Sequence, residues 1–197
     1  VRKVKAEEGI QELRKYSDSV IIVDNNRLTK LVPNLPLQAA FATADEVLAK
    51  AIGGLVWTIT MPSLLNIDFA DVRAIMGNGD VGFIAVGTGS GTSKVQTATE
   101  SVLKNRLLDV SFDTATGALM HITGGTSLTL GDAIAAGNGI VEHMHPNALV
   151  KFGARLVPTY EDKLEMVAIV TGVKGESILG KAVQERKEAN LGFIEPI

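Results

Sequence analysis

The chain has 197 residues, a net charge of -3 and no cysteine. This length supports one sizeable hydrophobic core or two small ones, and the lack of cysteine excludes disulfides and thiolate metal sites. A weakly acidic chain is a poor partner for nucleic acid, and no apolar run reaches the roughly 20 residues that cross a bilayer. With no signal peptide in view, we expect a cytoplasmic protein without a metal site of its own.

The first part of the sequence predicts two helices and one strand. Residues 1–16 carry an amphipathic helical pattern that is already under way at Val1, so we expect a fragment or a processed chain. Residues 19–23 are a β-branched run typical of a buried strand. Residues 37–60 lack proline and repeat apolar side chains at helical spacing, which predicts a helix about 35 Å long, buried between two layers. Within it, Gly53–Gly54 indicates a close contact or a bend.

The rest of the sequence alternates strands with helices, which predicts an α/β layer structure. We expect helices over residues 71–76, 93–104 and 130–143, and strands over residues 81–86, 118–122, 149–156 and 164–173. The polar turn at residues 160–163 is expected to join the last two strands as a hairpin. From residue 174 onward the chain becomes polar.

A glycine-rich segment, Val86–Lys94, follows a predicted strand and precedes a predicted helix. Loops of this kind bind phosphate where backbone N–H groups approach an anion at a helix N-terminus. The segment lacks the lysine that a P-loop places after its last glycine, and its spacing is not GxGxxG. A simple turn is the favoured interpretation, and binding of a small anion by Gly87–Gly91 is the alternative.

Three acceptor side chains, Asn66, Asp68 and Asp71, lie between Pro62 and an amphipathic segment that begins at Ala70. Acidic groups are favoured at a helix N-terminus because the free backbone N–H groups there carry partial positive charge. Asp68 as N-cap, with Asp71 at the third helical position, would form a capping box. By themselves, these residues predict the start of a helix.

The exact residues of this segment are more specific than its helix-capping pattern. Asn66-x-Asp68-Phe69-Ala70-Asp71-Val72 resembles the NxDFADV loop of FtsZ, the prokaryotic tubulin-like cell-division GTPase. Further segments similar to FtsZ follow in the same order: Phe41–Asp45, Leu107–Asp109 (with Arg106 where proline is usual), Gly117–Gly125 and Val167–Val173. Residues 1–174 thus resemble the second half of FtsZ.

The resemblance implies a fold and a division of the chain. The fold is α/β, with a long central helix packed against a mixed β-sheet with flanking helices, as in the C-terminal domain of the tubulin/FtsZ fold. Residues 1–35 would end the nucleotide-binding domain and residues 36–61 would form the central helix. Residues 62–174 would form the C-terminal, GTPase-activating domain, and residues 175–197 a polar tail.

The resemblance also implies contacts with guanine. Asn25, Phe41 and Asp45 match the family's residues at the base. The chemistry fits, because a carboxylate can accept hydrogen bonds from both N1–H and the 2-amino group of guanine. Without the resemblance, Phe41 fits core packing equally well, and Asp45 fits a solvated helix position.

In FtsZ the loop that matches Asn66, Asp68 and Asp71 reaches into the nucleotide site of the next subunit. The resemblance implies that the two carboxylates orient the water that attacks GTP bound with Mg²⁺, and that Asn66 hydrogen-bonds nearby. This role suits phosphoryl transfer, in which positioning and electrostatics dominate. GTP or GDP with Mg²⁺ is therefore the expected cofactor of the intact protein.

The sequence departs from FtsZ in having no glycine-rich phosphate-binding half. We therefore expect the chain alone to bind GTP poorly and not to hydrolyse it. The leading hypothesis is part of a GTP-dependent polymerising protein of the cytoplasmic division ring, which self-associates into filaments. Residues 190–197 would dock membrane-tethering division proteins, or would be a disordered end. The alternatives are an interaction module that caps filaments without catalysis, and an unrelated α/β ligand-binding domain.

Overall fold

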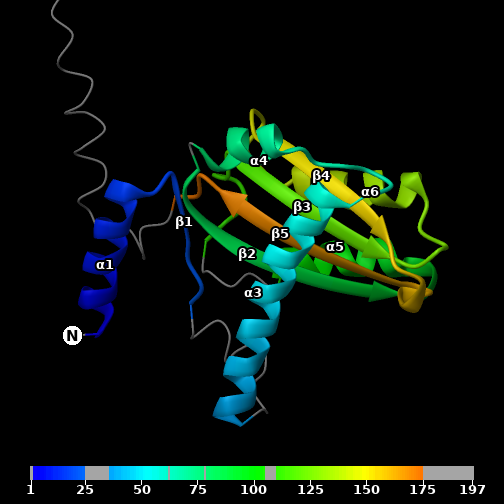
Figure 1. Cartoon of the computed structure of the whole chain (residues 1–197), viewed down its shortest axis with the longest axis horizontal. Helices are drawn as coiled ribbons and strands as arrows, with labels where there is room; N and C mark the ends of the chain where they lie inside the picture. The colour runs from blue at the N-terminus through cyan, green and yellow to red at the C-terminus, as the bar shows by residue number, and fades with distance from the viewer. Residues whose placement is uncertain (1, 25–35, 62, 78, 105–109, 175–197) are drawn as a thin grey trace, which may run out of the picture.

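Figure 1 presents the computed structural model of the chain. It describes residues 2–24, 36–61, 63–77, 79–104 and 110–174. Asn25 and the polar tail from residue 175 onward, both discussed above, lie outside the described residues.

Within these described residues, five strands form one mixed sheet in the order β1-β2-β5-β3-β4. The strands are β1 (Ser19–Ile21), β2 (Asp80–Ser90), β3 (Gly117–Gly124), β4 (Leu149–Leu156) and β5 (Lys163–Thr171). The pairs β1–β2 and β3–β4 are parallel, whereas β5 runs antiparallel to both β2 and β3. The expected mixed sheet is therefore confirmed.

The predicted hairpin between the last two strands is wrong. β4 pairs with β3 at the edge of the sheet, and β5 crosses to the centre, between β2 and β3. The reason lies in the two sequences. From Met166 to Thr171 every residue of β5 is buried, as suits a central strand, whereas β4 begins and ends with exposed leucines, Leu149 and Leu156.

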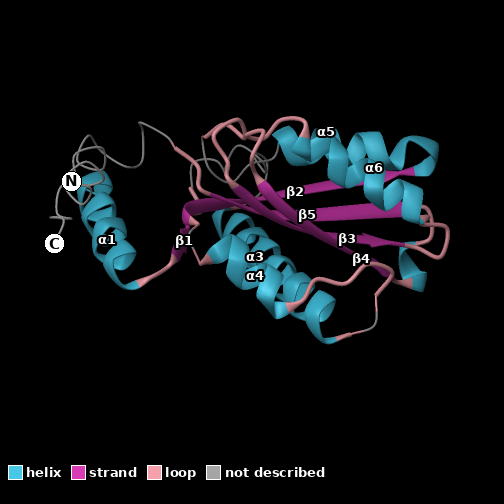
Figure 2. Ribbon diagram, turned by 90° about the horizontal axis from the view of Figure 1, so that it is seen from above, coloured by secondary structure: helices cyan, strands magenta, loops and turns pink. Residues whose placement is uncertain are grey.

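Helices cover both faces of the sheet (Figure 2). On one face lie α5 (Lys94–Lys104) and α6 (Leu130–Val141), which enclose the larger hydrophobic core. On the other face lie α3 (Leu37–Thr60) and α4 (Phe69–Met76), over a smaller core. The bounds predicted for the long helix are confirmed. Two short 3-10 turns, η1 (Gly91–Ser93) and η2 (Pro158–Tyr160), complete the order.

The first helix, α1 (Arg2–Tyr16), stands beside β1 at one end of the molecule (Figure 1). Arg14 holds it there through a two-pronged ion pair, in which Nε and Nη2 donate to the two carboxylate oxygens of Asp80 at 2.7 Å each. Asp80 is the first residue of β2. The N-terminal segment is thus joined to the sheet, and the proposed domain boundary near residue 35 stays a prediction.

The glycine-rich segment is mostly strand rather than loop. Gly87 and Gly89 lie inside β2, which ends four residues later than predicted, and both face α5. A Cβ on Gly87 would lie 2.2 Å from the carbonyl oxygen of Ala98, and one on Gly89 would lie 2.0 Å from that of Lys94. These two glycines therefore let α5 pack closely on the strand. This packing explains why glycine occupies both positions, and no ligand is needed to explain it.

Candidate functional site

The segment from Leu65 to Asp71, here called the acidic loop, is fixed to the sheet at its start. Leu65 and Ala154 of β4 exchange two backbone hydrogen bonds, of 3.2 and 3.0 Å. Ile67 points inward and is only 2% exposed, in the core between α3 and the sheet. The loop backbone is therefore held by hydrogen bonds at one residue and by burial two residues later.

The predicted capping box is present at the start of α4. The N–H of Asp71 donates to Oδ1 of Asp68 at 2.7 Å, and the N–H of Asp68 donates to Oδ2 of Asp71 at 3.5 Å. The second bond is long, so the first carries most of the capping. The two carboxylates are thus held side by side at the helix N-terminus.

Asp71 has a further partner that the sequence did not reveal. Nζ of Lys151, on β4, lies 2.9 Å from Oδ1 of Asp71. The hydrogen bond to Asp71 raises the pKa of Lys151 above its ordinary value. Eighty positions separate the two residues, and only the pairing of β4 beside β3 brings them together. The sequence signal was limited to the alternation of residues 149–156, which sets Lys151 and Arg155 on one face of the strand.

The outer side of the acidic loop is open. Asn66 and Asp68 are exposed, and the Phe69 side chain is 69% exposed. A large apolar side chain beside two polar acceptors is a combination typical of a surface that meets another protein. Phe69 was quoted in the sequence motif but was not singled out as a site residue.

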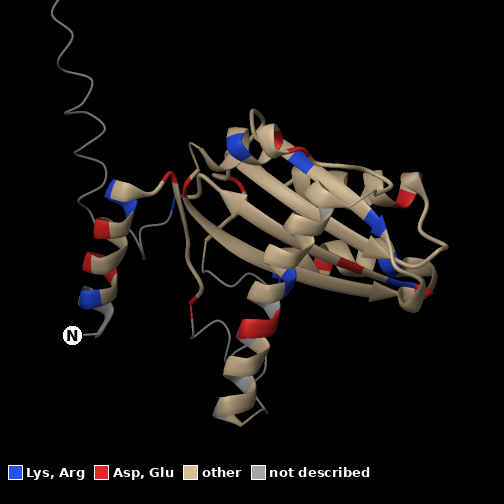
Figure 3. Cartoon of the chain, viewed as in Figure 1, with Lys and Arg blue, Asp and Glu red and all other residues tan. Residues whose placement is uncertain are grey.

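The residues predicted to contact guanine lie elsewhere. Phe41, 46% exposed, and Asp45, also exposed, stand one turn apart on α3. Asp45 is separated from Thr60, the last residue of the helix, by about 22 Å at 1.5 Å per residue. Among the acidic residues in Figure 3, those on the lower part of α3 lie far from those around α4. Within the described part of the chain, the acidic loop does not meet Phe41 or Asp45, the two described residues predicted to contact guanine.

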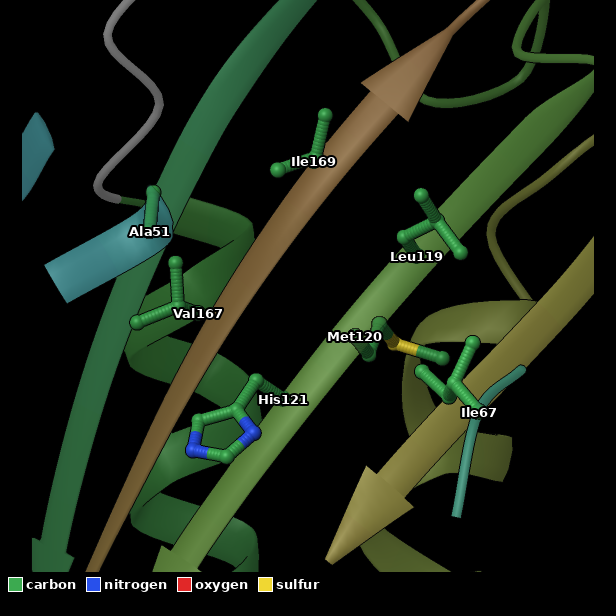
Figure 4. A pocket seen from close by; sticks show the side chains of 7 residues that line it. All are labelled: Ala51, Ile67, Leu119, Met120, His121, Val167 and Ile169. Carbon is green, nitrogen blue, oxygen red and sulfur yellow. The ribbon is translucent and has the colours of Figure 1, made fainter. Parts of the chain in front are cut away.

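A small cavity lies between α3 and the sheet (Figure 4). It measures about 10 Å³ and is lined by Ala51, Ile67, Leu119, Met120, His121, Val167 and Ile169. That volume holds about one water molecule, so the cavity has no room for a nucleotide. Burial, reinforced by the nearby positive charge of Arg155, lowers the pKa of His121 to about 4, and the Glu165 charge opposes this shift. His121 is therefore neutral at physiological pH.

Gly54 explains how α3 fits against this region. A Cβ on Gly54 would lie 2.7 Å from Cδ2 of His121, so the close contact predicted from the glycine pair is present. One turn further along the helix, the guanidinium of Arg155 on β4 stacks 4.1 Å from the centre of the Trp57 ring. Lys50 adds an ion pair with Glu165 of β5, at 2.8 Å. The C-terminal half of α3 is thus locked to the sheet.

Within the described parts of the chain, no group of three or more His, Asp or Glu side chains is placed to hold a metal ion. Asp68 and Asp71 supply carboxylates, but the described residues add no third ligand. Magnesium in proteins is commonly held by one or two carboxylates together with water and substrate phosphates. The described helices also include none that is long and apolar enough to cross a membrane.

Comparisons with known proteins agree with this geometry. Residues 80–174 match the sequence profile described as "FtsZ family, C-terminal domain". The chain is 46% identical, over 98% of its length, to cell division protein FtsZ 2 of Methanocaldococcus jannaschii, of which it covers 55%. It is 42% identical, over 95% of its length, to cell division protein FtsZ 2 of Halobacterium salinarum, of which it covers 48%.

Solved structures give the same result. An empty FtsZ dimer from M. jannaschii matches with a TM-score of 0.80 and 38% identity, covering 86% of this chain and 50% of that one. CetZ2 from Haloferax volcanii, solved as a protofilament with GTPγS bound, matches with a TM-score of 0.69 over 95% of this chain and 57% of that one. At 16% identity, the second likeness concerns the fold alone.

A long helix laid across a mixed five-stranded sheet, with a short capped helix following it, defines the C-terminal domain of the tubulin-like fold. The chain belongs to the FtsZ family. It spans about half the length of the curated relatives that it matches. This membership rules out the alternative of an unrelated α/β domain, whereas binding of a small anion by Gly87–Gly91 stays a prediction.

Proposed function

We propose that this chain is the part of a polymerising, GTP-dependent cell-division protein that completes the GTPase site of an adjacent subunit. The acidic loop would enter the neighbour's nucleotide site, and the start of α3 would form one edge of this subunit's own base pocket. The observation that carries the proposal is the separation of these two regions by the length of α3. Because the two regions cannot act on the same nucleotide, the acidic loop must find its nucleotide in another subunit.

This arrangement has a direct consequence for assembly. When two different surfaces at opposite ends of a subunit are complementary, subunits associate head to tail, and an arrangement that does not close on itself grows into a filament. The exposed Phe69 at the acidic loop is a suitable apolar contact for such an interface. The relatives named cell division protein FtsZ and the solved FtsZ dimer support this interpretation.

In the proposed chemistry, Asp68 and Asp71 orient the attacking water, and Asn66 hydrogen-bonds nearby. One oxygen of Asp68 accepts from the backbone N–H of Asp71, which fixes the carboxylate of this exposed residue. GTP and its Mg²⁺ would be held by the neighbouring subunit, with Mg²⁺ neutralising charge on the phosphates. The loop residues therefore contribute orientation and electrostatics rather than strong proton abstraction.

Further expectations about partners and location follow from this proposal. The chain would self-associate in a cytoplasmic division ring, without nucleic acid or insertion into the membrane. Asn25, Phe41 and Asp45 would contact guanine, and residues 190–197 would dock membrane-tethering division proteins. These assignments rest on the resemblance to FtsZ.

The test supplies the loop from a separate molecule. In full-length FtsZ 2 of M. jannaschii, the two residues aligned with Asp68 and Asp71 are replaced by alanine, so that this relative retains its nucleotide site. Adding the present chain should restore GTP hydrolysis, whereas the chain alone and its Asp71→Asn variant should not. Equal activation by the wild-type chain and Asp71→Asn would contradict the proposed role of the loop.

The same mixture distinguishes the proposed function from the alternative in which the chain only caps filaments. Substoichiometric chain that halts growth of wild-type filaments without raising hydrolysis of the loop-deficient relative would favour an interaction module without catalysis. Filament growth is followed by light scattering and hydrolysis by phosphate release, so the two outcomes are read independently.

A further inference from the structure

The Asp71 carboxylate has a partner at each of its oxygens. Oδ1 pairs with Nζ of Lys151 at 2.9 Å, and Oδ2 accepts the long bond from the Asp68 N–H at 3.5 Å. The shorter, charge-assisted contact is the stronger of the two. The orientation of Asp71 is therefore set mainly by Lys151, a residue outside the loop.

Lys151 is well placed to act as a fixed support. It lies on β4, three residues before Ala154, whose backbone pairs with Leu65 at the start of the acidic loop. Three residues of a strand span about 10 Å. The acidic loop is thus attached to one strand at both of its ends, and functional groups carried on strands are held more precisely than groups on free loops.

Charge gives Lys151 a second use at this position. A triphosphate is strongly anionic, and a loop that brings two carboxylates toward it meets repulsion. A lysine beside Asp71 offsets one of those negative charges. The hydrogen bond to Asp71 raises the pKa of Lys151, so the amine remains charged across the physiological range.

We propose that Lys151 is a positioning residue of the GTPase site, which holds the Asp71 carboxylate in the orientation that meets the neighbour's nucleotide. This inference rests on the proposed function. It is not a claim about folding, because the Lys151 side chain is 43% exposed and that of Asp71 24% exposed. Ion pairs this open to water contribute little to stability, so removing the amine should leave the fold intact.

The experiment uses the loop-deficient relative activated by the present chain, with Lys151→Met and Lys151→Arg. Lys104→Met is the matched control, because Lys104 forms a comparable surface pair with Glu100, at 3.4 Å, on α5. We measure the hydrolysis rate at saturating chain and the chain concentration that gives half of it. Misorientation of a reacting group is expected to lower the saturating rate of Lys151→Met roughly tenfold and to change the half-saturating concentration little.

Two further readouts separate positioning from a structural role. Lys151→Arg should retain most of the wild-type rate, because it restores a cation that can pair with Asp71. Raising the salt concentration should lower the wild-type rate toward that of Lys151→Met, because an exposed ion pair is screened. Lys104→Met should match the wild-type chain throughout.

Several results would overturn the inference. One such result is a Lys151→Met chain whose saturating hydrolysis rate equals that of Lys104→Met. Another is a Lys151→Arg chain whose rate falls as far as that of Lys151→Met. If Asp71→Asn abolishes activation while Lys151→Met is normal, only the inference fails. If Asp71→Asn activates normally, or the wild-type chain does not activate at all, the proposed function fails and takes the inference with it.

Discussion

The two ends of α3 are held in different ways. Toward its C-terminus, Ala51 and Gly54 are buried against the sheet and Lys50 is paired with Glu165. Toward its N-terminus, Phe41 and Asp45 are exposed, and the helix projects beyond the sheet (Figure 1). The acidic loop is therefore organised before any partner arrives, whereas the proposed base-binding end has its groups open to solvent.

This contrast suggests a division of labour within the proposed filament. A loop that must orient water in another subunit benefits from a rigid support, because binding then costs little ordering. An end that contributes only one edge of a pocket can be completed by other parts of the protein. The contrast can be tested by matched substitutions at the two kinds of position.

The largest effect is expected from removing a buried side chain at the acidic loop. Ile67→Ala deletes a side chain that is 2% exposed and should destabilise the chain by about 3–4 kcal/mol. Ile52→Ala on α3 removes the same atoms from a side chain that is 63% exposed, and should cost under about 0.5 kcal/mol. Urea unfolding measures the loss of stability in both variants. Similar losses would mean that the loop is not anchored by Ile67.

The next effect is a pH dependence that originates beneath α3. Burial and Arg155 lower the pKa of His121 from 6.5 to about 4 in the folded chain. The unfolded chain then binds the extra proton first, so the stability contributed by neutral His121 is present above pH 6.5 and is lost as the pH falls toward 4. The total is about 3 kcal/mol.

Urea unfolding at a series of pH values measures this loss. His121→Gln should flatten the slope between pH 6.5 and 5, whereas His143→Gln, at an exposed position, should leave it unchanged. An unaltered slope in His121→Gln would show that other groups cause the pH dependence.

Adjacent glycines of α3 should respond with opposite signs. Gly54→Ala places a Cβ 2.7 Å from the His121 ring and should destabilise the chain by about 2 kcal/mol. Gly53→Ala meets nothing within 4 Å and should stabilise the helix by about 0.5–1 kcal/mol. Thermal unfolding of the two variants is sufficient, and a shift of the same sign in both would argue against close packing at Gly54.

The smallest effect is expected at the cap. Asp68→Ala removes the acceptor of the Asp71 N–H and should lower stability by about 1 kcal/mol. Asp68→Asn keeps an acceptor at the same place and should retain most of that stability. If the two variants lose the same amount of stability, Asp68 does not contribute to the fold through capping.

The sequence predicted local features better than distant ones. The long helix, the capping box and the bounds of β4 were predictable because each depends on neighbouring residues. The position of β5 was not predictable, since a hairpin with β4 and a crossover to the centre of the sheet use the same turn residues. Only the burial of β5 on both faces distinguishes the two arrangements. Lys151 was missed for the same reason, because its contact with Asp71 depends on the position of β4 in the sheet. The roles of the six candidate site residues stay predictions.

The place of β5 also bears on how the chain acquires its fold. β5 is the last strand of the described residues, yet it separates β2 from β3 along nearly their full lengths. The sheet cannot close until the ribosome has released residues near 171, and the contacts that close it join positions almost ninety residues apart, such as Gly82 and Thr171. Such non-local pairing slows folding. A chain truncated before residue 163 would be left with two apolar strand edges exposed, and such edges promote aggregation.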